Sequence, residues 1–406
     1  MFEPQPLPPE ATGPTLMRTG ADPELLLVEP TTGIPRYWAT VWTLSLKGRS
    51  RSRNTTTAQL RQLEAFYRHC DTHFGVHSLD DATATRDAAA LQAMTESFHA
   101  ALTNSPHINT STAQRWGVAQ AFIRFTAKRL AISCDDWRAL LGYLDGMGGI
   151  RPSGYGAFRF LRALPTKTLN DIVEIAAPSS PRNPVKSEIH QWRNWLIVQL
   201  YLVCGLRRGE ALLLAVDSLK HDVDTSSGEF VYWLNVTTSE EEDFRWSQPS
   251  IKTTESHRQI PISPTVAALY EHYVNHIRSR SSEHGFLLSS QQGRALSAES
   301  VDKLFTQLTD GLTSEARRAF EIRTGGKRRV SPHDLRHTCA TAAYAAFMAV
   351  EPNRELTLQR MRALFGWSIK SEMPEHYARA AIQQDLMRSW NKLFDDQVHQ
   401  LRRLSR

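Results

Sequence analysis

The sequence has few cysteines, and their spacing excludes the common cysteine motifs. Four cysteines occur among 406 residues, and no two stand at the close spacing of a zinc knuckle or a redox motif. We therefore expect reduced thiols in the core of a cytosolic protein. These residues are Cys70, Cys134, Cys204 and Cys339.

Long hydrophobic runs are missing as well. No stretch approaches about 18 uninterrupted apolar residues, which argues against a membrane span. Residues 1–35 are rich in proline and acidic residues and lack the charged start and apolar run of a secretory signal. There is also no internal repeat that would indicate a solenoid. These absences predict a cytoplasmic protein with no membrane partner.

The residues that are present have the composition of folded domains with an excess of positive charge. Apolar residues make up 41% of the chain and charged residues 22%, as in ordinary globular proteins. The length allows two or three domains, each with its own core. Lys and Arg number 48 against 42 Asp and Glu, a formal charge of +6, which favours a polyanionic partner without identifying it.

The spacing of apolar residues predicts a helical first half. A helix is predicted from Asn54, because the apolar residues of the 60–67 stretch fall on one of its faces. Further helices fit residues 84–102, 110–130 and 135–145. A cluster of glycines and prolines begins at residue 146, which places an interdomain linker there.

The second half mixes helices with a few strands. Alternating apolar residues predict a strand at 230–236, and residues 251–262 and 286–288 predict two more. The acidic run 240–243 is interpreted as a solvated hairpin tip. Beyond Ser297 the pattern is again helical, so the predicted fold class is mostly α with a small β-sheet, an α+β protein.

The segment 331–338 is the most informative for chemistry. Ser331 and Pro332 predict a helix start, which places His333 in the first turn and Arg336 on the same face. A helix N-terminus favours a phosphate, and an imidazole and a guanidinium beside it strengthen that preference. A zinc site is the alternative interpretation of the two histidines at 333 and 337, but the zincin pattern has Glu where this chain has Asp.

Two further segments supply candidate residues. Arg207 follows a buried apolar helix, and Glu210 lies on the same helical face and can hold its guanidinium; an ordinary surface ion pair is the alternative. Trp367 is followed ten residues later by Tyr377, and each alone is more often a core residue. Lys252 precedes a short turn and a strand with an Ile-Pro pair.

The order of these groups along the chain resembles that of the tyrosine recombinase (phage integrase) family. The order is Arg207, Lys252 on a strand pair, His333-x-x-Arg336, Gly366-Trp367 and Tyr377. The resemblance is specific from about Leu164 to Arg388. It implies a helical SAM-like core-binding domain followed by a mixed catalytic domain, closing as a C-shaped clamp on DNA. The implied segments are an N-terminal arm or extension (1–53), a helical DNA-binding domain (54–145), a linker (146–164), the catalytic domain (165–395) and a tail (396–406).

The resemblance also implies a role for each group. Tyr377 is the expected nucleophile, forming a 3′-phosphotyrosyl bond and a free 5′-hydroxyl without ATP. Arg207 and Arg336 are expected to clamp the non-bridging phosphate oxygens, work that metals do elsewhere, so no metal and no cofactor is expected. Lys252 is the candidate for protonating the 5′ oxygen, with His333 assisting proton transfer.

Supporting residues and partners complete the expectation. Trp367 stands where many members have His, and its indole N–H can still contact the phosphate, while Glu210 orients Arg207 or His333. Lys327, Arg328 and Arg329 are candidate DNA contacts, or a solvated basic loop. The implied partners are double-stranded DNA with specific recombination sites, further copies of the chain in a tetramer, and accessory proteins.

Three functions remain open at this point. The first is a site-specific recombinase or integrase of a mobile element, in the bacterial cytoplasm beside the nucleoid. The second is a DNA-relaxing enzyme like the type IB topoisomerases, which uses similar residues without pairing two sites. The third is an architectural DNA-binding protein that kept the fold and lost the reaction. Such a protein would have no need for the whole set of Arg207, Lys252, His333, Arg336 and Tyr377.

Overall fold

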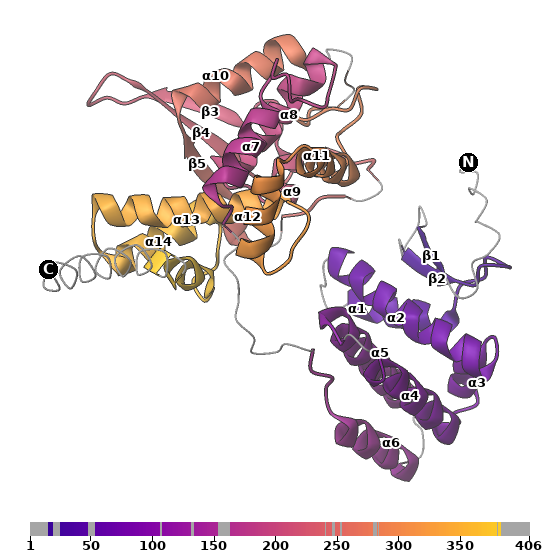
Figure 1. Cartoon of the computed structure of the whole chain (residues 1–406). Helices are drawn as coiled ribbons and strands as arrows, with labels where there is room; N and C mark the ends of the chain where they lie inside the picture. Colours follow the sequence, from indigo (N-terminus) through magenta and orange to yellow (C-terminus); the bar gives the residue numbers. More distant parts are fainter. Residues whose placement is uncertain are drawn as a thin grey trace, which may run out of the picture. The chain divides into compact units, whose positions relative to one another are not determined.

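The computed structural model divides the chain into two units, Met1–Phe158 and Arg159–Arg406 (Figure 1). Each unit is described by itself. The structure describes residues 15–18, 25–47, 53–105, 108–130, 134–152, 163–239, 241–245, 248–251, 254–278, 282, 284–379 and 381–382. None of the helices within these ranges has the length and apolar character needed to cross a membrane.

The first unit is a helical body with a small hairpin beside it. Its elements are β1 (Thr15–Arg18), β2 (Leu25–Val28), α1 (Tyr37–Lys47), α2 (Arg53–Phe74), α3 (Ser78–Ala84), α4 (Ala88–Thr103), α5 (Thr110–Arg129) and α6 (Cys134–Met147). The four apolar residues predicted to share one face of α2, Leu60, Leu63, Phe66 and Tyr67, are fully buried. The prediction of a helix with its apolar face in the core is therefore confirmed.

Polar side chains set where these helices begin. Asp87 caps α4 by accepting a hydrogen bond from the backbone N–H of Ala90, and Asn109 caps α5 by accepting one from Thr112. The helix predicted over 84–102 is α4, which begins at Ala88 because Asp87 caps it there; α3 precedes it and was not predicted. Short side chains with an oxygen acceptor satisfy N–H groups that the helix itself leaves unpaired.

The segment before α2 is also part of this core. Trp42 of α1 is buried and packs edge-on against Phe122 of α5, with ring centroids 5.9 Å apart. The sequence pattern assigned residues 25–47 to no helix or strand, because their apolar residues are interrupted by prolines and polar turns. In the structure they extend the helical body.

A buried group of charges joins this segment to α2 and α3, and we call it the Arg36 cluster. Arg36, only 2% exposed, donates to Asp71 Oδ2 at 2.5 Å and to Asp80 Oδ2 at 3.3 Å, and its Nη1 lies 2.5 Å from His77 Nδ1. The hydroxyl of Tyr67 also donates to Asp80, at 3.0 Å. One guanidinium thus faces two carboxylates.

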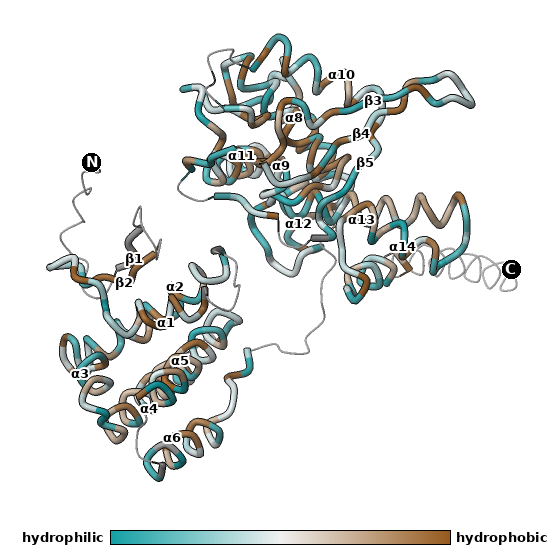
Figure 2. Tube along the Cα trace, turned by 180° about the vertical axis from the view of Figure 1, so that it is seen from behind, coloured by the Kyte–Doolittle hydropathy of each residue, from teal (hydrophilic) through white to brown (hydrophobic). Residues whose placement is uncertain are grey.

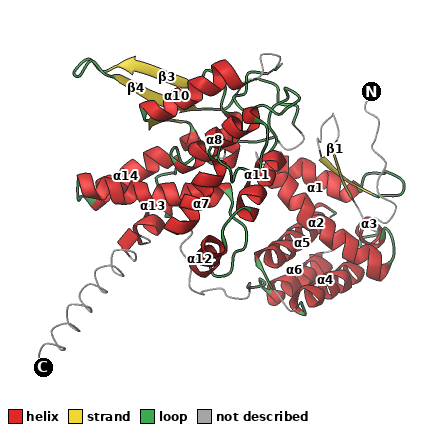
Figure 3. Cartoon of the chain, turned by 45° about the horizontal axis from the view of Figure 1, so that its top comes forward, coloured by secondary structure: helices red, strands yellow, loops and turns green. Residues whose placement is uncertain are grey.

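The second unit combines helices with a three-stranded antiparallel sheet in the order β3-β4-β5 (Figure 3). Its elements are α7 (Thr166–Ala176), α8 (Glu188–Leu202), α9 (Arg208–Leu213), β3 (Leu219–Val223), β4 (Phe230–Val236), the 3-10 helix η1 (Thr254–Ser256), β5 (Arg258–Ile262), α10 (Pro264–His272), the π-helix η2 (Tyr273–Ile277), α11 (Ala298–Asp310), α12 (Ser314–Thr324), α13 (Pro332–Val350) and α14 (Arg354–Phe365). A further helical segment covers residues 373–379. The predicted α+β class is therefore confirmed.

The sheet differs from the prediction in three places: β3 is an additional strand, the strand predicted over 251–262 covers only Arg258–Ile262 among the described residues, and residues 286–288 contribute an isolated bridge at Phe286 instead of a strand. Leu234 of β4 pairs with Leu219 of β3 and with Ile260 of β5, so an apolar row faces the core. Strand β3 was not predicted, because polar residues fill most of it. The described part of the acidic run, residues 241–243, lies in the connection between the antiparallel strands β4 and β5, as a hairpin requires, with Glu241 and Glu242 exposed. Asp243 accepts from Arg245 Nη2 at 2.7 Å.

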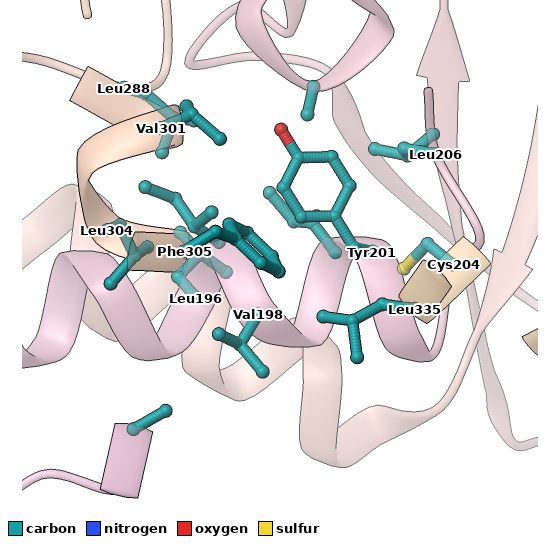
Figure 4. Packing of buried hydrophobic residues seen from close by; sticks show 14 of the residues in the cluster. Leu196, Val198, Tyr201, Cys204, Leu206, Leu288, Val301, Leu304, Phe305 and Leu335 are labelled. Atoms are coloured by element: carbon teal, nitrogen blue, oxygen red, sulfur yellow. The ribbon is translucent and has the colours of Figure 1, made fainter. Parts of the chain in front are cut away.

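Helices α8 and α11 meet in the core of the second unit, to which most of its other elements also contribute (Figure 4). Tyr201 of α8 packs edge-on against Phe305 of α11, with ring centroids 5.9 Å apart, and Leu335 brings the start of α13 into the same cluster. The hydropathy colouring in Figure 2 shows brown stretches alternating with teal along these helices, as amphipathic helices require. The core therefore holds α8, which leads into Arg207, together with α13, which carries His333 and Arg336.

Candidate active site

Arg207 lies at the start of α9, where the chain leaves the core. Its backbone N–H donates to Glu210 Oε2 at 2.8 Å, and its Nη1 donates to Glu210 Oε1 at 2.5 Å. The guanidinium also donates to Ser256 Oγ at 3.1 Å and to the carbonyl of Gly366 at 3.1 Å. A side chain held by three elements is fixed in direction, and 26% of it remains exposed.

Glu210 is the centre of a group of three arginines, which we call the Glu210 cluster. Besides Arg207, its buried carboxylate binds Arg258 Nη2 at 3.0 Å and lies 3.5 Å from Arg336 Nη1. Burial acts to raise the pKa of Glu210, but the positive charges, Arg258 foremost, outweigh it and lower the pKa below its ordinary value. Three guanidinium groups against one carboxylate leave a surplus of two positive charges.

Arg336 is buried on α13 and joins the ends of two other helices. Ser331 and Asp334 form the capping box that begins α13, as the Ser-Pro pair predicts. Arg336 donates to the carbonyl of Gly205, just past α8, and to the carbonyl of Phe365, the last residue of α14, at 2.8 Å. Burial first, and then the charge of Arg207, lowers the pKa of Arg336 to about 9, so it stays protonated at neutral pH.

Two glycines allow the backbone at residues 205 and 366 to lie close to the side chains packed around the arginines. Gly205 has φ +59°, and a Cβ there would lie 2.5 Å from the ring of Phe365. Gly366 also has φ +59°, and a Cβ there would lie 2.9 Å from Arg258 Nη1 and from Ser256 Cα. Both conformations and both contacts favour glycine, so the backbone at these two turns is part of the arginine arrangement.

The rings of Trp367 and Tyr377 stack on each other beside Arg336. Their centroids lie 5.3 Å apart with the planes at 12°, and Trp367 also stacks on Phe365 at 4.9 Å. The Arg336 guanidinium carbon lies 5.1 Å from the Phe365 ring centroid and 5.7 Å from that of Trp367, within cation–π range. The stack therefore connects Tyr377 to the arginines through continuous contact.

The Tyr377 side chain is buried, with 2% of the residue exposed. Its hydroxyl lies 2.5 Å from Nδ1 of His337, on α13. His333, one turn earlier, is exposed, and its ring lies 4.4 Å from that of His337 at 79°. The structure thus brings Arg207, Glu210, Arg336, Trp367 and Tyr377 together, with His333 at the start of the same helix.

The model of the phage integrase family matches residues 164–383, more than half of the 406-residue chain. This chain belongs to the phage integrase family. A comparison with curated proteins gives no match. Among solved structures, the crystal structure of XerA recombinase is similar over 87% of this chain and 98% of that chain, at 15% sequence identity and a TM-score of 0.34.

Family membership confirms the resemblance to tyrosine recombinases that the order of residues indicated, and it implies a DNA substrate. The matched region contains every element of the site described above. A surplus of positive charge fixed by buried contacts is complementary to a phosphodiester. Among the described residues, no group of three or more His, Cys, Asp or Glu side chains is arranged to hold a metal ion.

Other predicted residues of this integrase-family chain lie elsewhere. Lys252 lies outside the described residues, so its role stays a prediction. In the basic loop, Lys327 pairs with Asp334 and Arg329 Nη2 donates to the carbonyl of Asp302 at 2.8 Å, whereas the side chain of Arg328 is exposed. Two of the three candidate DNA contacts therefore also serve internal contacts.

Two residues of the site, Arg258 and His337, were not predicted as functional. Arg258 binds Glu210 and, through Nε, donates to the carbonyl of Leu364 at 2.8 Å. His337 was weighed only as half of a zinc site. Helical spacing could have found it, since position 337 is four residues from 333 and follows Arg336 directly. No local signal indicates that Tyr377 would reach it.

Proposed function

We propose that this chain is a site-specific DNA recombinase that cuts and rejoins strands through a covalent 3′-phosphotyrosine at Tyr377. The observation that supports it best is the continuous contact from Glu210 through Arg336 and Trp367 to Tyr377. These groups come from parts of the sequence far apart. A protein that only binds DNA would have no need of a tyrosine hydroxyl beside a fixed surplus of positive charge.

In the proposed reaction the arginines bind the scissile phosphate. Arg207, which is partly exposed, binds a non-bridging oxygen of the phosphate. The buried Arg336, next to Glu210, adds positive charge that stabilises the phosphate oxygens. As Tyr377 attacks, negative charge grows on those oxygens, and preorganised guanidinium groups stabilise the growing charge most. Tyr377 stacks on Trp367, whose ring lies within cation–π range of Arg336, and this supports the role of that charge.

The leaving 5′ oxygen needs a proton, and Lys252 is the proposed donor, with His333 assisting. The proposed contact of Trp367 with the phosphate would use its indole N–H. Glu210 holds the guanidinium groups in position without touching the substrate. Because the phosphotyrosyl bond conserves the energy of the phosphodiester, a free 5′-hydroxyl from another strand can reverse the step.

The wider assembly is proposed from family resemblance. The helical domain (54–145) and the catalytic domain (165–395), joined by the linker (146–164), would clamp duplex DNA through phosphate contacts that weaken with salt. Residues 1–53 would extend the helical domain, and the tail (396–406) lies outside the described residues. A tetramer on two specific sites, with accessory proteins, serving a mobile element in the bacterial cytoplasm, is the proposed setting.

The test is covalent trapping on DNA. Purified protein is incubated with suicide substrates that carry candidate sites from its own genetic neighbourhood, and denaturing gels reveal protein–DNA adducts. We expect an adduct with the wild type and none with Tyr377→Phe, which keeps the stacked ring and loses only the hydroxyl. Absence of any adduct on a site that the protein binds would favour the architectural alternative, and relaxation of supercoils by a monomer would favour the topoisomerase alternative.

A further inference from the structure

The hydroxyl of Tyr377 contacts His337, a residue to which the family resemblance assigns no catalytic role. His337 Nδ1 lies 2.5 Å from the phenolic oxygen, and both side chains are buried, with 2% of Tyr377 and 4% of His337 exposed. We infer that His337 is a catalytic residue that takes the phenol proton when Tyr377 attacks the phosphate. This inference rests on the proposed function and adds the proton acceptor that the reaction needs.

The chemistry of the nucleophile requires such an acceptor. A tyrosine with an ordinary pKa of about 10 is ionised in roughly one molecule in a thousand at neutral pH. A neutral imidazole ionises near pH 6.5 and is the side chain best matched to accepting a proton at neutral pH. With the Nε2–H tautomer, Nδ1 is the acceptor and the phenol donates to it.

The Oη–P bond forms and the P–O5′ bond breaks, while the phenol proton moves to His337 Nδ1 and a separate acid protonates the 5′ oxygen. In rejoining, the 5′-hydroxyl attacks phosphorus, the Oη–P bond breaks, and the imidazolium returns its proton to the tyrosine oxygen. His337 therefore ends each cycle as it began, and no co-reactant is consumed.

The surroundings hold the pair in place. The Tyr377 ring is stacked on Trp367, which limits its rotation and keeps the hydroxyl on the side of α13. His337 follows Arg336 on α13, and Arg336 binds backbone carbonyls at the ends of two other helices, which fixes this part of α13. The ring of His333 meets that of His337 edge to face, one helical turn away. His337 can therefore accept the proton of the Tyr377 hydroxyl, while His333 assists protonation of the leaving 5′ oxygen.

The first experiment removes the proposed base, His337, but keeps a hydrogen-bond acceptor for the Tyr377 hydroxyl. In His337→Asn, the amide oxygen can occupy the position of Nδ1 and accept the same hydrogen bond, but it does not take up a proton. We expect single-turnover cleavage of a suicide substrate to slow by about 10²- to 10⁴-fold, the usual contribution of general base catalysis. DNA affinity and thermal unfolding should stay near wild type. His376→Asn, the same change beside the tyrosine in sequence, is the matched control and should cleave like wild type.

The pH dependence separates proton transfer from positioning. Without a base, cleavage depends on spontaneous ionisation of the phenol, so the rate of His337→Asn should rise about tenfold per pH unit above neutrality. Wild type should lack this slope. The ionisable groups close to the His337 ring include His333, His376 and Tyr377, and Arg336 directly precedes it on α13. His337→Gln repeats the measurement should the Asn variant fail to fold.

A substrate with sulfur in place of the bridging 5′ oxygen completes the test. Such a leaving group needs no protonation, so it restores cleavage to a variant that lacks the acid but not to one that lacks the base. We expect His337→Asn to remain slow on it. Wild-type rates in His337→Asn, or full rescue by the sulfur substrate, would overturn the inference while leaving the Tyr377 adduct and the proposed function intact. Failure of wild type to form an adduct would instead remove the proposed function.

Discussion

Each unit of this protein contains a buried group of charges, and the two groups have opposite balances. In the Arg36 cluster one guanidinium faces two carboxylates, whereas in the Glu210 cluster one carboxylate faces three guanidinium groups. Burial raises the pKa of Asp80 and Asp71, but the arginines lower that of Glu210. The first group can reach neutrality by taking up a proton.

The Glu210 cluster has no comparable means of neutralisation, because guanidinium groups keep their protons at physiological pH. Its surplus positive charge is fixed by contacts to three helices and a strand. Under the proposed function, the phosphate of the DNA supplies the negative charge that offsets this surplus. The Arg36 cluster, with the opposite balance, needs only a proton for neutrality.

The largest expected effect comes from removing the one negative charge among three arginines. Glu210→Gln keeps the shape of the side chain and leaves the guanidinium groups uncompensated in a buried place. We expect the free energy of unfolding of the second unit to fall by about 3–5 kcal/mol, as when one partner of a buried pair is removed. Denaturant titration followed by hydrogen exchange at α9 and α13 would measure it. A loss below about 1 kcal/mol would contradict the view that Glu210 holds the arginines together.

A smaller loss is expected from Arg36→Met in the first unit. The two carboxylates then lose their counter-charge, at a cost of about 2 kcal/mol near neutral pH. Both have pKa values raised on folding by burial, so their protonated forms favour the folded state and their ionisation opposes it. The deficit should therefore shrink as the pH falls toward the carboxyl pKa range. Urea unfolding at several pH values tests this, and a deficit that grew on acidification would contradict it.

The smallest effect is expected at the neighbouring arginine of α9. Arg208 binds Asp302 through two contacts of 2.9 Å, but both side chains are about half exposed. Water screens such a pair, so Arg208→Met should change the free energy of unfolding by less than about 1 kcal/mol. This variant serves as the control for Glu210→Gln, because it alters charge one residue from Arg207 without entering the cluster. A loss as large as that of Glu210→Gln would mean that burial does not separate the two pairs.

Local patterns in the sequence predicted the framework of the site. The Ser-Pro pair predicted the start of α13, and with it the neighbouring positions of His333 and Arg336, because a capping residue and a proline act within one turn. The apolar face of α2 was equally readable. In both cases the information lies within a few residues of the feature.

Contacts between distant segments could not be predicted in the same way. Arg258 binds Glu210 across 48 residues, and Tyr377 meets His337 across 40. No propensity or spacing rule specifies which polar groups become partners once helices pack, since this depends on the packing of the whole unit. Strand β3 was missed for a related reason, because its pairing with β4 stabilises a stretch that has little strand character of its own.

The two backbone carbonyls bound by Arg336 affect whether this arginine can be used to recognise active relatives of the chain. A lineage that abandoned strand transfer would still need this side chain to bind the ends of α8 and α14, so selection for stability alone would preserve it. Its survival is therefore a poor marker of activity. The hydroxyl of Tyr377 lies against the His337 side chain rather than a helix end, so under the proposed function a change to phenylalanine would be an early sign of a relative that no longer cuts DNA.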